Sequence, residues 1–303
     1  MTGLTDLQKK ISALLPHVEL RFEEPMQKHT SFRIGGNVEV MAFPKNTEEL
    51  AEILKTSALL DSNPAILGAG TNILAPDEGI RGIVICLKDC LSGMEQLEEH
   101  RIRIAAGVTM TRAAVYAAGL GLSGMEFAHG IPGTVGGGVY MNAGAYGGEI
   151  KDICESVDVM DMDGKIQTVS GTDMHFSYRH SILEDHPGIV VSAVFCLEPK
   201  PEAEIRARMK ELQTKRSASQ PLDLPSAGSA FKRPVGGYAA ALIDEAGLKG
   251  YAVGGAAIST KHAGFAVNQG GATARDMKEL FRQVSDIVFE KSGIRLEPEV
   301  RFW

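Results

Sequence analysis

Two glycine-rich segments are the strongest candidates for chemistry in this 303-residue chain. The first continues a strand-like stretch into GAGTN at 68–72, and the second, 129–150, has eight glycines in the 19 residues from Gly130 to Gly148. Glycine lets backbone N–H groups approach phosphate oxygens closely, and the Thr71 hydroxyl and Asn72 amide add donors. Together the segments would suit a dinucleotide with its pyrophosphate between them. A tight turn and a crossover of packed strands are the structural alternatives.

The first segment differs from the dinucleotide fingerprint of a doubly wound α/β fold. Its third glycine is missing, and no acidic residue follows about 20 residues later at the end of a strand. Pro76 also prevents a long helix from following the turn. The segment therefore predicts a phosphate-binding turn of another kind, or a turn alone.

A third group consists of scattered polar residues. Arg179 lies in YRHS at 178–181, Ser229 lies in a Ser/Gly turn with adjacent cations at 225–234, and Glu299 and Arg301 alternate on the last strand. Surface ion pairs and turn or cap residues are the structural alternatives. No HExxH pairing or Ser-His-Asp order occurs, and the four cysteines have no metal-ligand spacing. We therefore expect no metal, and reduced thiols.

The charge balance excludes one class of partner. The formal net charge of −7 is unfavourable for nucleic-acid binding, which needs a basic face. The segment 205–262 is different, with nine Lys/Arg against four acids, and it predicts either a site for a small anion or a solvated basic face. No apolar run approaches the roughly 20 residues that span a bilayer, and MTGLTDLQKK is charged where a signal peptide is apolar. We expect a cytoplasmic protein with no membrane or nucleic-acid partner, and a monomer is favoured.

Apolar periodicity and turn signals predict an α+β fold without regular βαβ alternation. Asn46 and Glu49 are typical of a capped helix start, and Asp163-Gly164 between alternating segments predicts a two-residue hairpin turn. Pro199 to Glu204 is rich in Pro and charge, which indicates a domain boundary. The expected helices cover 4–15, 109–118, 202–215, about 237–246 and 274–291, and the helix that Asn46 caps would bury Leu50, Ile53 and Leu54. The expected strands cover 38–43, 64–67, 80–87, 101–105, 189–197 and 295–303.

Taken in order, seven motifs resemble the MurB family, the UDP-N-acetylenolpyruvoylglucosamine reductases. They are HTSFRIGG (29–36), LGAGTNIL (67–74), GIPGTVGGGVYMNAGAYGGEI (130–150), YRHSI (178–182), SAGSAFKRP (226–234), LIDEAGLKGYAVGGAAISTKHAGFAVN (242–268) and LEPEVRFW (296–303). The first three resemble flavoproteins of the vanillyl-alcohol-oxidase type more broadly, whereas SAGSAFKRP and LEPEV are specific to the family. The resemblance covers nearly the whole chain.

This resemblance implies an architecture: a two-lobed FAD-binding domain of the vanillyl-alcohol-oxidase (PCMH) type, with a smaller α+β substrate-binding domain. The FAD-binding domain would cover 1–200, with lobes of about 1–88 and 89–200, and the substrate-binding domain 201–303. The last strand, 294–303, would return to the FAD-binding domain.

The same resemblance implies an activity, NADPH-dependent reduction of UDP-N-acetylglucosamine enolpyruvate to UDP-N-acetylmuramate for peptidoglycan. FAD would be bound noncovalently, and NADPH and the enolpyruvyl substrate would enter one cleft in turn. An FAD-dependent oxidase or dehydrogenase of a small alcohol or hydroxy acid is the alternative on the same fold. A noncatalytic flavin- or nucleotide-binding module is a further alternative, but it leaves Arg179, Ser229 and Glu299 unexplained.

Residue by residue, the resemblance implies that Ser229 donates a proton, Arg179 polarises the substrate carboxylate and Glu299 assists. Lys232 would stabilise the serine alkoxide. The implied cofactor-binding residues are Ser31, Gly68, Ala69, Gly70, Thr71, Asn72, Ile73, Gly107, Ile131, Pro132, Gly133, Thr134, Gly136, Gly137, Asn142, Ala143, Gly144, Ala145 and Gly147. The implied substrate-binding residues are Tyr146, Tyr178, Lys232, Arg233, Lys249, Lys261 and Arg301.

The chain resembles the shorter, type II class of the family. Only 50 positions separate Arg179 from Ser229, which leaves little room for the tyrosine-bearing loop that closes over UDP in the longer form. Arg233 also stands where the longer form has Asn. No lid tyrosine is therefore assigned.

Overall fold

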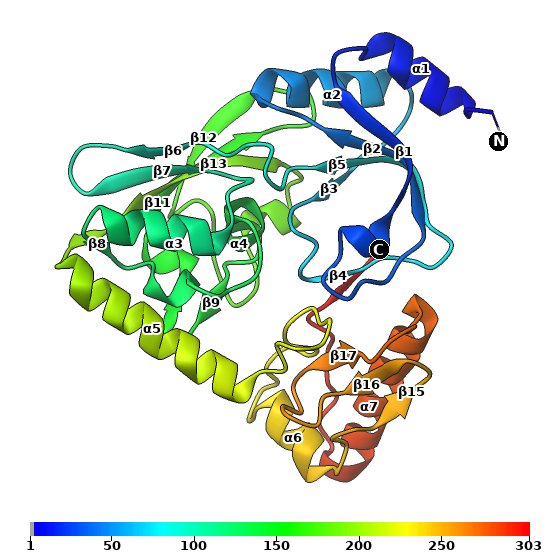
Figure 1. Cartoon of the computed structure of the whole chain (residues 1–303), viewed down its shortest axis with the longest axis vertical. Coiled ribbons are helices and arrows are strands. Elements are labelled where there is room, and N and C mark those ends of the chain that lie inside the picture. Colours follow the sequence, from blue (N-terminus) through cyan, green and yellow to red (C-terminus); the bar gives the residue numbers. More distant parts are fainter. Residues whose placement is uncertain (1–2) are drawn as a thin grey trace. The chain divides into compact units, whose positions relative to one another are not determined.

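The computed structural model describes residues 3–303, which form two compact units (Figure 1). The first unit comprises residues up to Phe22, Val40–Ala69 and Gly82–Lys215, and the second comprises Glu23–Glu39, Gly70–Arg81 and Arg216–Trp303. The chain passes from one unit to the other at five places: in the turn between Ala69 and Gly70, and within β1 (Glu19–Pro25), β2 (Asn37–Phe43), β5 (Ile80–Cys86) and α5 (Glu202–Ser219). The functional division into 1–200 and 201–303 stays a prediction.

Two sheets form the framework of the first unit. One is four-stranded with the order β1-β2-β5-β3, and the other is five-stranded with the order β12-β11-β13-β7-β6. The remaining helices and strands of this unit are α1 (Asp6–Leu14), α2 (Thr47–Leu59), β3 (Ala65–Leu67), β6 (Met94–Gln96), β7 (Arg101–Ala105), α3 (Met110–Gly119), β8 (Leu122–Ser123), α4 (Val135–Tyr140), β9 (Gly144–Ala145), β10 (Gly148–Glu149), β11 (Cys154–Met160), β12 (Ile166–Ser170), β13 (Ile189–Cys196) and β14 (Glu198–Pro199).

The first unit has two hydrophobic cores, one for each sheet. Apolar faces of α1 and α2, including Ile11 and Ile53, pack with β2 and β5 in one core. In the other core α4 packs against β13, and α3 lies beside α4 (Figure 1). Strand β13 is buried at every residue except the last, Cys196, as its mostly apolar sequence predicts. Asn46 caps α2 by accepting a hydrogen bond from the Glu49 N–H (2.8 Å), which confirms the predicted helix start.

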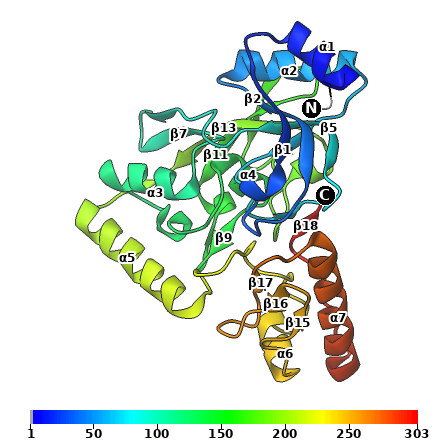
Figure 2. The same ribbon diagram turned by 45° about the vertical axis from the view of Figure 1, so that its right-hand side comes forward.

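The second unit is built around one long helix, α7 (Ala274–Ser292), and a three-stranded antiparallel sheet in the order β15-β16-β17 (Figure 2). Its other helices and strands are β4 (Ile73–Leu74), α6 (Ala239–Glu245), β15 (Ala252–Val253), β16 (Ala256–Ile258), β17 (Ala266–Asn268) and β18 (Arg301–Phe302). The apolar face of α7 packs with α6 and this sheet in one core. These helices and strands confirm the α+β prediction.

Local sequence explains both ends of α7. Thr273 and Asp276 form a capping box, and Gly293 ends the helix in the left-handed region (φ 73°). The Asp77 carboxylate also accepts hydrogen bonds from the N–H groups of Ala274 and Arg275 (2.7 and 3.0 Å). A negative charge is favourable there because the helix dipole is positive at its N-terminus.

Two predicted elements differ from the structure. The β11–β12 hairpin forms, but its loop is longer than two residues: the last ladder pair is Met160 and Ile166, and the Asp161 N–H then donates to the Lys165 carbonyl (2.9 Å), which leaves residues 162–164 between them. Asp161 causes this, because its Oδ1 accepts hydrogen bonds from the N–H groups of Asp163 and Lys165 (3.0 and 2.8 Å). The predicted terminal strand is regular only at Arg301–Phe302, and before it Pro298 forms an isolated antiparallel bridge with Phe231.

Candidate functional site

The Ser/Gly turn predicted to carry chemistry lies between two other segments of the second unit. The Ala230 N–H donates to the Gly264 carbonyl (2.8 Å), and the Ala230 carbonyl accepts from the Glu299 N–H (2.9 Å). Ser229 and Glu299 therefore lie on neighbouring, hydrogen-bonded segments although 70 positions separate them. Ser229 is exposed and Glu299 is half-buried.

The last strand is attached to the GTN segment. β18 pairs with β4 in parallel, and the Arg301 N–H donates to the Asn72 carbonyl (3.0 Å). The Asn72 side-chain Nδ2 donates in turn to the Glu299 carbonyl (3.1 Å). The Ser31 N–H donates to the Gly70 carbonyl (2.9 Å) on the other side of the same segment. The second unit thus brings together two predicted cofactor segments and two predicted catalytic or substrate residues.

The predicted substrate-binding cations already have contacts within the protein. Lys232 pairs with Glu297, Lys249 pairs with Asp244 (2.6 Å), and the Lys261 Nζ donates to the Ser217 carbonyl (2.7 Å). The Arg233 guanidinium stacks on the ring of Tyr238, with its Cζ 4.0 Å from the ring centroid. Exposed ion pairs of this kind contribute little stability, so exchange of a partner for an anionic ligand costs little. Their substrate role stays a prediction.

Arg179 belongs to the first unit and lies in a two-residue turn. Ser177 and His180 exchange two backbone hydrogen bonds (3.1 and 3.2 Å), which leaves Tyr178 and Arg179 as the turn residues. The Arg179 Cζ is 5.0 Å from the centroid of the Tyr178 ring. Tyr178 is exposed and Arg179 is half-buried. The two residues predicted to contact substrate here are therefore adjacent and at the surface.

Many of the predicted cofactor glycines are required by the packing of the protein itself. A Cβ on Gly107 would overlap the Leu87 carbonyl oxygen, and a Cβ on Gly136 would lie 2.9 Å from the Ala106 Cβ. A Cβ on Gly144 would lie 2.7 Å from the Glu149 Cβ. Close packing of strands and α4 therefore explains a large part of the glycine density, as the structural alternative proposed.

Other glycines leave the backbone open and fit a bound dinucleotide. A Cβ on Gly137 would have only the Thr134 Oγ1 near it, at 3.6 Å, and a Cβ on Gly147 would meet nothing within 4 Å. The turn at Gly68 approaches the same helix start, because a Cβ there would lie 2.8 Å from the Thr134 Oγ1. Gly68, where the first glycine-rich segment begins, therefore neighbours the second segment at Thr134 within the first unit, and the backbone at Gly137 and Gly147 is open.

Comparison with known proteins decides the family. An FAD-binding-domain model matches residues 38–170, and the model of the C-terminal domain of UDP-N-acetylenolpyruvoylglucosamine reductase matches residues 220–303. The reductase of Agathobacter rectalis is 45% identical over 304 residues, which cover 97% of this chain and 96% of the relative. The chain belongs to the UDP-N-acetylenolpyruvoylglucosamine reductase family.

Further members of the UDP-N-acetylenolpyruvoylglucosamine reductase family agree with this assignment. The enzyme of Caldanaerobacter subterraneus subsp. tengcongensis is 44% identical, with 97% of each chain covered. The crystal structure of the Thermus caldophilus member has a TM-score of 0.78 and 36% identity, and the match covers 95% of this chain and 99% of that one. The protein is therefore an FAD-containing oxidoreductase, and its predicted fold class is confirmed. NADPH is the reductant in this reductase family.

Two residues that hold these segments in place, Ser181 and Asp77, were not predicted from the sequence. Ser181, in the YRHSI motif, is fully buried and donates its Oγ to the Tyr140 carbonyl (2.8 Å). Asp77 connects the loop after β4 to α7, as described above. The sequence signal for Ser181 is a hydroxyl residue directly after the charged YRH segment, whereas no sequence signal pairs Asp77 with residue 274.

Residues 3–303 contain neither a metal-ligand cluster nor a membrane-spanning helix. No group of three or more His, Cys, Asp or Glu among these residues could hold a metal ion. Within the same range, no helix combines the length and apolar character that a membrane crossing needs.

Proposed function

We propose that the protein reduces UDP-N-acetylglucosamine enolpyruvate to UDP-N-acetylmuramate with NADPH, in peptidoglycan precursor synthesis. Bound FAD would supply the hydride transfer that links NADPH oxidation to reduction of the enolpyruvyl group at C3. The open backbone at Gly137 and Gly147 and the turns at Gly68 and Asn72 would hold the cofactor. We place the reaction in the cytoplasm, because phosphorylated nucleotides do not cross a bilayer unaided.

Hydride addition at C3 leaves negative charge at C2, which delocalises into the adjacent carboxylate. In this proposal the Arg179 guanidinium binds that carboxylate through two hydrogen bonds and stabilises the charge. Its planar fork matches a carboxylate in a way that a lysine cannot. The half-buried Glu299, when protonated, donates a further hydrogen bond.

Ser229 delivers the proton to C2 in this mechanism. A serine hydroxyl is a weak acid in water, but the enolate is strongly basic and a nearby cation stabilises the alkoxide that remains. Lys232 is three residues away, and its backbone N–H donates to the Glu297 carbonyl (2.8 Å), so the 229–232 segment runs beside the 297–299 segment. The overall reaction balances, because addition of one hydride at C3 and one proton at C2 converts the enol ether to a lactyl ether.

The hydrogen bond between the Glu299 N–H and the Ala230 carbonyl gives this proposal its strongest structural support. It brings the SAGSAF and EPEV motifs, the most family-specific parts of the sequence, into one pair of segments. An oxidase or dehydrogenase of a small alcohol gives no reason for this pairing.

The test is an anaerobic absorption experiment on the FAD-loaded protein. One equivalent of NADPH should bleach the oxidised flavin band, and UDP-N-acetylglucosamine enolpyruvate should restore it. A band that stays bleached after addition of this substrate would remove the substrate assignment while leaving the flavoprotein intact.

The Ser229→Ala variant separates the two half-reactions. Bleaching by NADPH should keep its parental rate, and the return of the band should slow by about 10² to 10⁴, the usual contribution of a general acid. The Ser219→Ala variant is the control, because Ser219 is a surface-helix serine at the end of α5. A parental rate of return in Ser229→Ala would end the proton-donor assignment.

A further inference from the structure

The backbone at Arg179 is strained and needs external support. Its φ is 57°, in the left-handed region that a long side chain rarely adopts. Only Tyr178 and Arg179 lie between Ser177 and His180, the two stem residues of the turn. Two backbone hydrogen bonds between Ser177 and His180 close it. Such a conformation persists only where neighbouring structure fixes it.

Two buried side chains fix the stem of this turn from both sides. The Asn142 Nδ2 donates to the Ser177 carbonyl (2.9 Å), directly before the turn. The Ser181 Oγ donates to the Tyr140 carbonyl (2.8 Å), directly after it. Asn142 and Ser181 are both 0% exposed. The two hydrogen bonds attach the Arg179 turn to one short stretch, residues 140–142, at the end of α4.

The Asn142 amide is fully used within the protein. Besides Ser177, its Nδ2 donates to the Glu149 Oε2 (2.6 Å), and its Oδ1 accepts from the Lys151 N–H (2.9 Å). Its φ of 42° suits asparagine better than other non-glycine residues. Both amide hydrogens thus have protein partners, and the side chain joins the 149–151 segment to the Arg179 turn.

We propose that Asn142 and Ser181 are positioning residues that act through Arg179, holding its guanidinium where it meets the substrate carboxylate. This inference rests on the proposed function. Two-point hydrogen bonding to a carboxylate tolerates errors of only about 0.5 Å, and a misplacement of about 1 Å costs roughly 10² in rate. A turn with an unfavourable φ and a surface location needs buried anchors to meet that tolerance.

The first measurement uses the protein without cofactor. Hydrogen–deuterium exchange of the peptide that covers 174–184 should be faster in Ser181→Ala and in Asn142→Ala than in the parent. The matched control is Ser192→Ala, which removes another buried hydroxyl of the first unit, bonded to the Asp158 Oδ2 (2.7 Å). Parental exchange of the turn in both variants would overturn the proposal.

The second measurement compares half-reactions of FAD-loaded Ser181→Ala alone, because Asn142 is among the residues predicted to bind the cofactor. Flavin reduction by NADPH in this variant should stay within about twofold of the parent, because it does not use the substrate carboxylate. Reoxidation by the enolpyruvyl substrate should slow by about tenfold or more, as expected for lost transition-state stabilisation. Equal slowing of both half-reactions would indicate general structural damage and overturn the proposal. If Asn142→Ala does not fold, the hydrogen–deuterium exchange of Ser181→Ala alone decides the first measurement.

A double-mutant cycle with Arg179→Ala decides whether the effect passes through Arg179. Ser181→Ala should slow reoxidation in the parent and add nothing in the Arg179→Ala background. If Ser181→Ala slows reoxidation in the Arg179→Ala background by the same factor as in the parent, the positioning role is overturned. Slow reoxidation in Arg179→Ala together with a parental reoxidation rate in Ser181→Ala would overturn the positioning role alone. A parental rate in Arg179→Ala itself would overturn the Arg179 assignment in the proposed function, and the positioning role with it.

Discussion

The Asn72 side chain donates a hydrogen bond to the main-chain carbonyl of Glu299 (3.1 Å), 227 positions later in the chain. The Asn72 carbonyl accepts a hydrogen bond from the Arg301 N–H (3.0 Å). Asn72 therefore binds the terminal segment through both its side chain and its main chain. A segment predicted to bind cofactor therefore also fixes the segment of the predicted acidic partner. Substitution of Asn72 should therefore affect both the predicted cofactor segment and the Glu299 segment.

Asn72→Ala should lower the free energy of unfolding by about 1 kcal/mol, the usual net value of one hydrogen bond. It should also slow flavin reoxidation by the enolpyruvyl substrate, because the Glu299 segment loses an anchor. Urea denaturation and stopped-flow absorbance measure the two effects. Asn63→Ala, at an exposed loop position, is the control and should change neither quantity by more than experimental scatter. An Asn72→Ala protein with parental reoxidation would show that this anchor has no role in the reaction.

The sequence predicted local structure where one short segment contains its own signal. The Asn46 cap, the buried β13 and the amphipathic α7 depend on neighbours within a few residues, so periodicity and capping rules apply directly. The β11–β12 loop was wrong in length because the Asp161 side chain competes with the Asp163-Gly164 turn. A pattern of turn residues does not rank such competing hydrogen bonds.

Contacts between distant segments could not be predicted from spacing. Nothing in the sequence states that Asp77 accepts from Ala274, or that Asn142 reaches Ser177. The resemblance named Arg179, Ser229 and Glu299, and the structure places Ser229 and Glu299 on neighbouring segments of one unit. Their catalytic roles stay predictions, as do those of the cofactor and substrate residues.

The glycines offer a test that separates cofactor binding from packing. Gly137→Ala places a methyl group in open space on α4 and should stabilise the apoprotein by up to about 1 kcal/mol through helix propensity. The same methyl group should raise the dissociation constant of FAD at least about tenfold, because it occupies the approach to the backbone. Thermal unfolding of apoprotein and titration with FAD measure these opposite effects.

Two further glycines serve as references for that test. Gly93→Ala also adds a Cβ that meets nothing within 4 Å, but outside the predicted cofactor residues, so FAD affinity should be unchanged. Gly107→Ala should prevent folding, because its Cβ overlaps the Leu87 carbonyl oxygen. Parental FAD affinity in folded Gly137→Ala would show that the open backbone there does not contact the cofactor.

The four cysteines should differ sharply in reactivity. Burial raises the pKa of both Cys90 and Cys154 to about 12, so only about one thiol in 10⁴ is ionised at pH 8. Cys196 is exposed. A water-soluble maleimide should therefore label Cys196 first in the native protein, and all four thiols in denaturant, as measured by mass spectrometry. Cys196→Ser should remove the fast phase; fast labelling at Cys90 instead would contradict the prediction.

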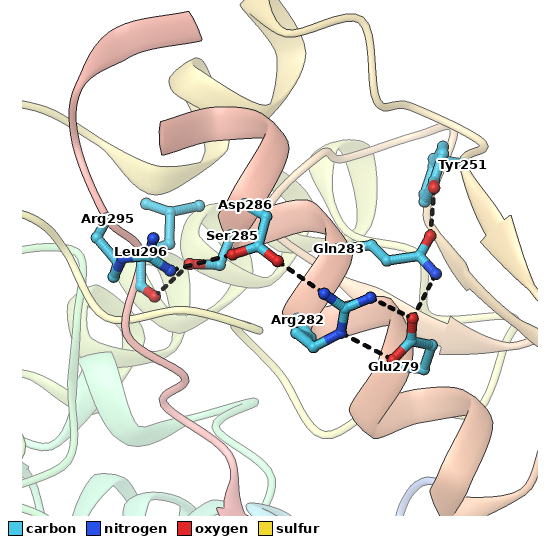
Figure 3. Close-up of polar contacts among 8 residues, drawn as sticks. All are labelled: Tyr251, Glu279, Arg282, Gln283, Ser285, Asp286, Arg295 and Leu296. Atoms are coloured by element: carbon cyan, nitrogen blue, oxygen red, sulfur yellow. Dashed lines mark hydrogen bonds and ion pairs between the residues drawn. The ribbon is translucent and has the colours of Figure 1, made fainter. Parts of the chain in front are cut away.

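Polar side chains on α7 form a connected network (Figure 3). Glu279 accepts hydrogen bonds from the Arg282 Nη2 and the Gln283 Nε2 (both 2.6 Å), and Gln283 accepts from the Tyr251 hydroxyl. Arg282 also donates to Asp286 (2.9 Å). Hydrogen bonds from Arg282 and Gln283 lower the pKa of the Glu279 carboxyl from 4.5 to about 2.

This lowered pKa gives stability a defined pH dependence. The unfolded chain binds the Glu279 proton more tightly than the folded chain, so the contribution is full above about pH 4.5 and is lost as the pH falls toward about 2. Glu279→Gln should therefore lower the urea midpoint at about pH 6.5, and the difference from the parent should shrink steadily below about pH 4.5. Salt should reduce the effect because the pair is exposed. Glu290→Gln, on the same helix, is the matched control; a Glu279→Gln difference that stays constant from about pH 6.5 to about pH 3 would mean that the network does not depend on the charge of Glu279.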